Sequence, residues 1–186
     1  PGSATAVTAV EEAQAWTGPA WRCGQIKKIG LHPFGMLAVG FALGVVSRLL
    51  DRYTQNLGNM FSQLAIWILF GVLITLYSSS QKKAMGNVFF FCIGMLSTYY
   101  LVAWMTDGVY SEVMIVGWTI FAFCSPVFAF FTWLTKGNGI FPNVIRVGIL
   151  LVSLLTSIIL FDGLRIYDVI INGVLFYFLF FKKVER

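Results

Sequence analysis

The sequence predicts an all-α membrane protein, a six-transmembrane-helix bundle with both termini in the cytoplasm. Its composition is the first reason: 58% of the 186 residues are hydrophobic and 11% are charged, with a mean hydropathy of +0.81. Soluble domains carry about 25% charged residues. The second reason is that six apolar segments follow one another after residue 33, and a membrane helix needs about 20 mostly apolar residues. These segments are continuously apolar rather than alternating, which excludes a transmembrane barrel.

Proline, glycine and charged residues bound the six predicted helices. The helices cover about residues 34–50, 60–77, 87–105, 113–134, 143–161 and 166–181. Pro33 marks the start of the first, since proline is tolerated in the first turn of a helix. Pro126 lies inside the fourth and removes a backbone hydrogen bond, so we expect a kink there. A glycine-rich turn and Pro142 precede the fifth helix, and Lys182 follows the sixth.

The charges between the helices alternate along the chain, and this alternation orients the protein. The N-terminal flank, two of the gaps and the C-terminal tail hold basic residues: Arg22, Lys27, Lys28, Lys82, Lys83, Lys136, Lys182, Lys183 and Arg186, with Arg146 just inside the fifth helix. The other gaps hold Asp51, Asp107, Glu112, Asp162 and Asp168. Cytoplasmic loops are enriched in Lys and Arg, so both termini are expected inside a bacterial cytoplasmic membrane. The lipid bilayer, rather than nucleic acid, is the expected partner of the basic residues.

The first 25 residues differ from the rest of the chain, since they are rich in Ala and Thr. We interpret residues 1–25 as a cloning remnant or a disordered tail. No signal peptide is predicted, because the stretch before Lys27 lacks an apolar core. Residues 26–186 are expected to form one transmembrane domain.

Polar and aromatic residues gather near the predicted outer ends of several helices. Arg48 lies one turn before Asp51 and Arg52, and Asn172 lies about a turn inside the apolar zone of the last helix. A buried amide is costly in lipid and usually faces protein or a cavity. Aromatic walls with a few converging polar groups are typical of small-molecule pockets. The predicted ligand-binding residues are Arg48, Gln63, Trp67, Ser97, Tyr99, Tyr100, Trp104, Asp162, Arg165, Asp168 and Asn172.

A simpler interpretation of these residues is an interfacial belt. Tyr and Trp prefer the depth of the lipid headgroups, and arginine side chains can extend toward water from within the membrane. The charges also leave the ligand open, since the acids suit a cationic group and the arginines suit a carboxylate or phosphate.

The first helix has two stripes of small residues, Gly40 with Gly44 and Ala38 with Ala42. Small residues four apart let another helix approach closely. They predict helix packing, either within this bundle or against a partner subunit.

No enzyme is predicted. His32, the only histidine, lies at the cytoplasmic end, about 30 Å from the outer acids, whereas catalysis needs contacts near 3 Å. The three cysteines have no metal-ligand spacing, and we expect no catalytic residue, no metal and no cofactor.

Two stretches, Gly58–Leu69 and Lys82–Tyr100, resemble a family of small six-helix bacterial membrane proteins found in Firmicutes that has no assigned function. In architecture the chain is also similar to the substrate-binding (S) components of energy-coupling factor vitamin transporters. That resemblance implies that Ala38 and Ala42 meet a coupling subunit. It further implies an ATPase partner and a pocket lined by Tyr99, Tyr100, Trp104, Arg165 and Asn172. The chain lacks a vitamin-specific signature of that family.

Two hypotheses on function follow. The first is a membrane protein that binds or transports a small solute through an outer-facing pocket, as the substrate-binding subunit of a larger transporter. The alternative is a non-transporting accessory, immunity or assembly protein that acts through helix–helix contacts.

Overall fold

The computed structural model describes residues 31–54, 64–106, 112–137, 139–161 and 165–182. Within these ranges the chain is all-helical and contains no strand. The helices are α2 (Pro33–Tyr53), α4 (Leu64–Tyr77), α5 (Gln81–Met105), α6 (Glu112–Leu134), α7 (Ile140–Phe161) and α8 (Ile166–Phe176), and the π-helical segment η1 (Tyr177–Phe181) continues α8. The predicted all-α bundle is therefore confirmed for the described residues. The predictions made for residues 1–25, Gln63 and Asp162 lie outside them.

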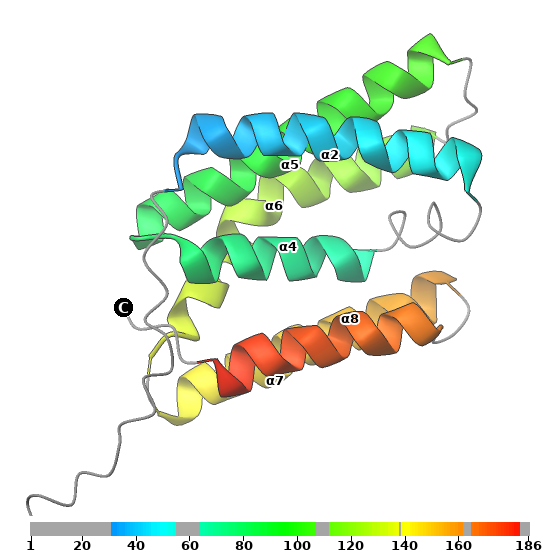
Figure 1. Cartoon of the computed structure of the whole chain (residues 1–186). Helices are drawn as coiled ribbons and strands as arrows, with labels where there is room; N and C mark the ends of the chain where they lie inside the picture. Colours follow the sequence, from blue (N-terminus) through cyan, green and yellow to red (C-terminus); the bar gives the residue numbers. More distant parts are fainter. Residues whose placement is uncertain (1–30, 55–63, 107–111, 138, 162–164, 183–186) are drawn as a thin grey trace, which may run out of the picture.

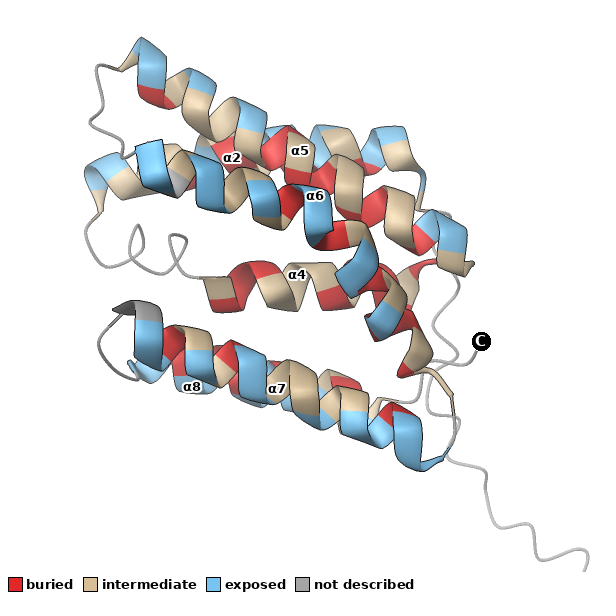
Figure 2. Ribbon diagram, turned by 180° about the vertical axis from the view of Figure 1, so that it is seen from behind, coloured by how far each residue is buried: buried red, intermediate tan, exposed pale blue. Residues whose placement is uncertain are grey.

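The helices have the length and surface expected of a multi-pass membrane protein. Four of them contain spans long and apolar enough to cross a bilayer: Pro33–Tyr53, Gln81–Met105, Ile115–Leu134 and Ile140–Ile159. The remaining two, Leu64–Tyr77 and Ile166–Phe181, are shorter and also apolar. Large apolar side chains such as Phe123, Phe131, Leu151 and Ile159 are exposed on α6 and α7, and Figure 2 shows exposed residues along the outward sides of these helices. Soluble monomers rarely expose large apolar patches, so this surface is compatible with lipid contact.

Helices α2, α5 and α7 extend at least three residues beyond the predicted bounds, and a local reason is clear for α5 and α7. Helix α5 begins at Gln81 rather than near residue 87, because the Ser80 hydroxyl accepts a hydrogen bond from the Lys83 amide and caps its first turn. Helix α7 begins at Ile140, which places Pro142 in the first turn, where it costs no helical hydrogen bond. Helix α2 continues to Tyr53. This extension keeps the polar residues from 48 to 52 on a helix.

The bundle has α4 at its centre (Figure 1). Helix α2 lies along α5, and α6 packs against the other side of α5. Helices α7 and α8 run side by side on the far side of α4. Because α4 contacts α5, α6, α7 and α8, it joins the two parts of the bundle.

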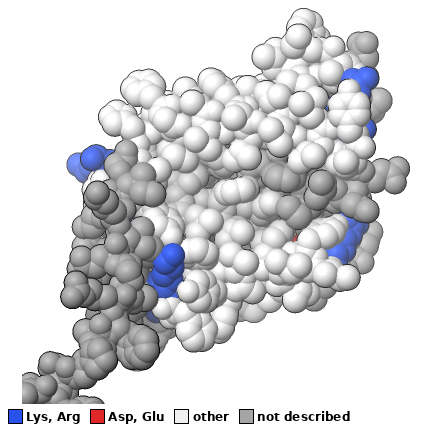
Figure 3. Space-filling view, in the orientation of Figure 1, with Lys and Arg blue, Asp and Glu red and all other residues white. Residues whose placement is uncertain are grey.

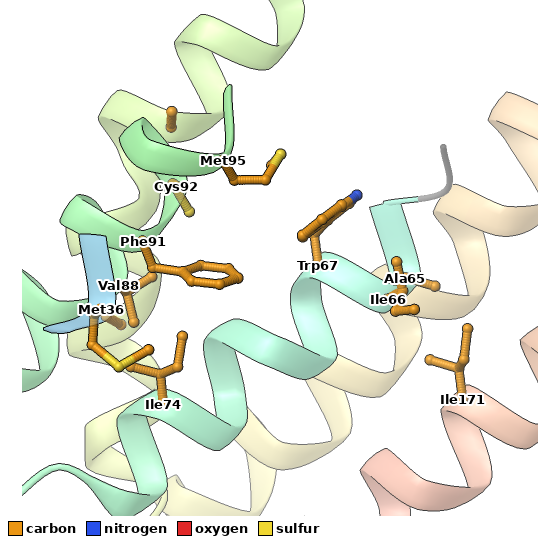
Figure 4. Packing of buried hydrophobic residues seen from close by; sticks show 12 residues of the cluster. Met36, Ala65, Ile66, Trp67, Ile74, Val88, Phe91, Cys92, Met95 and Ile171 are labelled. Carbon is orange, nitrogen blue, oxygen red and sulfur yellow. The ribbon is translucent and has the colours of Figure 1, made fainter. Parts of the chain in front are cut away.

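The core lies around α4 and is apolar. Trp67 and Phe70 of α4 pack against Phe91 of α5, with ring centroids 6.2 Å and 6.0 Å from that of Phe91. Figure 4 shows Trp67 and Phe91 directed into the space between these helices, with Ile171 of α8 on the opposite side of α4. A second apolar cluster, made of Val72, Leu76, Leu175 and Leu179, joins α4 to α8 and η1.

Glycine sets the close approach of α2 and α5. Gly40 and Gly44 are buried, and a Cβ atom added to either would collide with the backbone of Phe91 or Met95 in α5. A Cβ added to Gly94 would lie 2.6 Å from the Leu37 carbonyl oxygen. Contacts this close are typical of small-residue helix pairs in membranes. The Gly40 and Gly44 stripe therefore packs inside this bundle, whereas Ala38 and Ala42 are exposed.

Pro126 has the expected effect on α6. The helix changes direction in its second half, as Figure 2 shows. Proline lacks the N–H that would normally bond to the carbonyl four residues earlier, here that of Ala122. The Ser125 hydroxyl donates to this Ala122 oxygen at 2.7 Å instead. A neighbouring side chain thus satisfies the freed carbonyl, as membrane helices require.

The charged residues lie at the two ends of the bundle. In Figure 3 the lysines and arginines are seen at opposite ends, and the surface between them is uncharged. The helix ends near residues 54, 64, 106, 112, 161 and 165 share one end, which we call the 165 end. The ends near residues 31, 80, 136 and 182 share the other, the 136 end. Lys82, Lys83, Lys136 and Lys182 lie at the 136 end, whereas Asp51, Glu112 and Asp168 lie at the 165 end together with Arg48, Arg52 and Arg165. Among the described residues, the structure thus separates the lysines from the acids but leaves three arginines beside the acids.

Candidate functional site

One polar cluster joins α2 to α5 at the 165 end. Arg48 donates from Nη1 to Asp51 Oδ2 at 3.1 Å, and the Tyr99 hydroxyl donates to the same oxygen at 2.9 Å. The Arg48 guanidinium also lies over the Tyr99 ring, 5.5 Å from its centroid. One turn further on, Arg52 donates to the Thr106 carbonyl at 3.2 Å. These contacts hold the ends of α2 and α5 together, and they already use the Asp51 oxygen nearest to Arg48.

A second polar cluster lies between α7 and α8. Asp168 is fully buried although it is an acid near the start of an apolar helix. Its Oδ2 accepts a hydrogen bond from the Arg165 amide at 3.0 Å, which gives a partner to one of the free backbone N–H groups at the N-terminus of α8. Its Oδ1 accepts a hydrogen bond from the Ser157 hydroxyl of α7 at 3.1 Å. A carboxylate in the first turn also interacts favourably with the helix dipole. Asp168 therefore caps α8 and joins it to α7.

The same cluster continues one helical turn deeper. Asn172 follows Asp168 by four residues and donates from Nδ2 to the Asp168 carbonyl at 2.9 Å. Ser153 precedes Ser157 by four residues and accepts, through its carbonyl, a hydrogen bond from the Ser157 hydroxyl. Because α7 and α8 run antiparallel and touch at Ser157 and Asp168, Ser153 and Asn172 each lie one turn deeper than this contact. Among the described residues, no partner lies within hydrogen-bond reach of Ser153 Oγ or Asn172 Oδ1.

The other predicted ligand residues lie in different surroundings. Trp67 is buried in the core between α4 and α5, only 5% exposed. Tyr100 packs edge-on against Tyr99, with centroids 5.3 Å apart. Ser97 is exposed, and so is Trp104, with 70% of its surface accessible.

Arg165 is the N-cap residue of α8 and directly precedes its first turn, as the predicted start of this helix at residue 166 implies. Its exposed guanidinium donates to the Tyr167 hydroxyl at 2.5 Å, and this contact raises the pKa of Arg165 above its usual value.

The structure thus divides the predicted pocket into two clusters. Arg48, Tyr99 and Tyr100 lie on the α2–α5 pair, whereas Asp168 and Asn172 lie on α8. Helix α4 occupies the space between them (Figure 1). Each cluster contains buried polar atoms without a hydrogen-bond partner among the described residues: Arg48 Nε in the first, and Ser153 Oγ and Asn172 Oδ1 in the second. Arg48 Nε can only donate, whereas the α7–α8 cluster (Ser153, Ser157, Asp168 and Asn172) combines two unpartnered oxygen atoms with a fully buried carboxylate. The α7–α8 cluster is therefore the candidate site.

Two residues of this cluster, Ser153 and Ser157, are absent from the sequence-based prediction. Both are buried within α7. Their spacing of four places them on one face of an otherwise apolar helix, a signal that was available in the sequence. This spacing indicates a site only once the structure shows that the serine face of α7 lies against Asp168.

Polar contacts also close the 136 end. Buried Asn87 donates to the Ser78 hydroxyl at 3.0 Å and to the Leu31 carbonyl at 3.3 Å. Lys136 donates to the Ser78 carbonyl at 3.2 Å, and its ammonium lies 3.6 Å from the centroid of the Trp133 ring. These contacts join the start of α2, the α4–α5 turn and the end of α6, so they stabilise the fold at this end.

A comparison with protein families, with curated proteins and with solved structures finds no match to this chain.

Proposed function

We propose that this chain is a multi-pass protein of a bacterial cytoplasmic membrane that binds or transports a small polar solute at the α7–α8 cluster. The buried carboxylate of Asp168 is the observation that supports the proposal most directly. Ionisable residues within membrane helices are rare and usually mark a ligand or ion pathway. Asn172 and Ser153, one helical turn from Asp168 and Ser157, add oxygen atoms that have no hydrogen-bond partner among the described residues, and a solute with polar groups could bind to them.

The proposed orientation has both termini in the cytoplasm. Lys82, Lys83, Lys136, Arg146 and Lys182 lie at the 136 end, and no acid accompanies them among the described residues. The positive-inside rule then places the 136 end in the cytoplasm and the α7–α8 cluster toward the outside. An alkaline phosphatase fused after Arg186 is expected to be inactive, since this enzyme needs export to fold. Full phosphatase activity in intact cells would overturn the orientation.

The small, exposed side chains of Ala38 and Ala42 would let a helix of a partner protein pack closely against α2. They lie on α2 away from the glycines that pack against α5. In the proposed transporter a coupling subunit, associated with an ATPase, meets α2 at these alanines. The second candidate function, an accessory or assembly protein without transport, would use the same surface.

A single purification distinguishes the two functions. The protein is extracted in mild detergent, its co-purifying proteins are identified, and its melting temperature is measured against a panel of small metabolites. We expect one chemical class to stabilise the wild type and Asn172→Leu to lose that response, because the amide supplies an unpartnered oxygen. Trp104→Ala, which changes an exposed residue on α5, is expected to keep it. A partner lost in Ala42→Leu without any metabolite response would favour the accessory role, and no response and no partner would overturn both.

A further inference from the structure

We propose that the α7–α8 cluster is a binding site for a monovalent metal cation, Na⁺, held by four oxygen atoms. The inference rests on the proposed site and names the ion that occupies it. Its ligands would be a carboxylate oxygen of Asp168, the hydroxyl oxygens of Ser157 and Ser153, and Oδ1 of Asn172.

The charge of the cluster is the first argument. Asp168 is fully buried, and within the described part of the chain no Lys, Arg or His side chain forms an ion pair with it. The nearest basic residue in the sequence, Arg165, donates from its exposed guanidinium to Tyr167 and interacts with the Asp168 charge only weakly, through solvent. A buried charge is costly unless an opposite charge or a metal compensates it. The helix dipole and two hydrogen bonds compensate Asp168 only in part, so a single positive charge would complete the balance.

The chemistry of the unpartnered atoms is the second argument. Asn172 Oδ1 can only accept, and its own Nδ2 is already used by the Asp168 carbonyl. Protonation of Asp168 would neutralise the carboxylate, but it would not provide a hydrogen-bond donor for the Asn172 oxygen, which lies one turn deeper. A metal cation would both neutralise Asp168 and bind the Asn172 oxygen, because hard cations bind carboxylate, amide and hydroxyl oxygens alike.

The composition of the cluster indicates the charge of the ion. One carboxylate with three neutral oxygens gives a net charge of −1, which a monovalent ion neutralises. Calcium sites usually combine several carboxylates, and within the described residues no group of three or more His, Cys, Asp or Glu could hold a metal ion. The short side chains and the direct Ser157–Asp168 hydrogen bond hold α7 and α8 close together, which favours the smaller Na⁺ over K⁺.

The test compares salts at constant ionic strength. Purified protein is dialysed into choline chloride, and its melting temperature is followed as NaCl or KCl replaces the choline. A bound ion that favours the folded state raises the melting temperature with its concentration. We expect a rise of several degrees with NaCl that saturates, and little change with KCl. No rise with NaCl, or an equal rise with KCl, would overturn the proposal, as would stabilisation that depends on pH alone.

Two serines provide a matched pair of variants. Ser153 and Ser47 are both buried, and both hydroxyl oxygens lack a partner among the described residues. Ser153→Ala should fold like the wild type, but the NaCl concentration that gives half of the rise in melting temperature should be at least tenfold higher. Ser47→Ala on α2 should respond to NaCl like the wild type. Asp168→Asn should abolish the response. If Ser153→Ala responds like the wild type, Ser153 is not a ligand and the proposed site is wrong. A metabolite response that survives without any Na⁺ response would leave the proposed function standing.

Discussion

Replacement of Gly44 by alanine is expected to destabilise the protein by about 2–3 kcal/mol, the cost of forcing extra atoms into a packed interior. The added Cβ would collide with the Met95 carbonyl and the Thr98 hydroxyl. Neither can move without cost, because one belongs to the α5 backbone and the other donates to the Phe41 carbonyl of α2 at 3.0 Å. The two helices would have to separate, and the contacts of Tyr99 on α5 with Arg48 and Asp51 on α2 would lengthen. Melting temperature and yield of folded protein in detergent measure the loss.

Gly35→Ala is the matched control. Gly35 lies on the same helix, and an added Cβ there meets no atom within 4 Å. Alanine favours helix over glycine by up to about 1 kcal/mol, so this variant should be as stable as the wild type or slightly more so. Equal effects of the two substitutions would show that α2 and α5 do not approach as closely as the structure places them.

Replacement of Asp168 by alanine in sodium-free buffer should cost about 3 kcal/mol, since buried groups that lose a charged hydrogen-bond partner are left unsatisfied. The Ser157 hydroxyl would lose its bond to Oδ1 and the Arg165 amide its bond to Oδ2. Asp168→Asn retains one acceptor and should lose about half as much. The absence of sodium separates this structural contribution from that of a bound cation.

Glu112→Ala is the control for charge. Glu112 also lies in the first turn of a helix, α6, but it is exposed. Its removal should change stability by less than about 0.5 kcal/mol, as for most surface substitutions. If Asp168→Ala were equally mild, the carboxylate would not be buried between α7 and α8.

Much of the fold could be predicted from the sequence, because long apolar segments leave few alternatives to helices. The errors concern the helix ends. Gln81, Lys82 and Lys83 have the composition of a loop, yet they are helical because Ser80 caps them. Capping is a contact between single atoms, and a hydropathy pattern does not contain it.

The site was less predictable than the fold. The sequence indicates the depth at which each polar residue lies, since depth follows from position along a helix. It does not indicate which helices are neighbours, and here α4 lies between α5, which carries Tyr99, and α8, which carries Asn172 (Figure 1). Ser157 was missed for the same reason, because its hydroxyl is informative only when it lies beside Asp168.

The hydrogen bond between Ser157 and Asp168 also has a consequence for biosynthesis. Ile166–Phe181 is one of the two shorter apolar helices, and it carries the Asp168 carboxylate in its first turn. A carboxylate opposes the insertion of an apolar segment, by about 2.5–3.5 kcal/mol at the centre of the helix and by less toward its ends. A hydrogen-bond partner for Asp168 would therefore help the last helix to enter a bilayer. Since α7 supplies the partner for Asp168 and precedes it directly in the chain, the two helices are suited to leave the translocon together, as one hairpin that is already internally bonded.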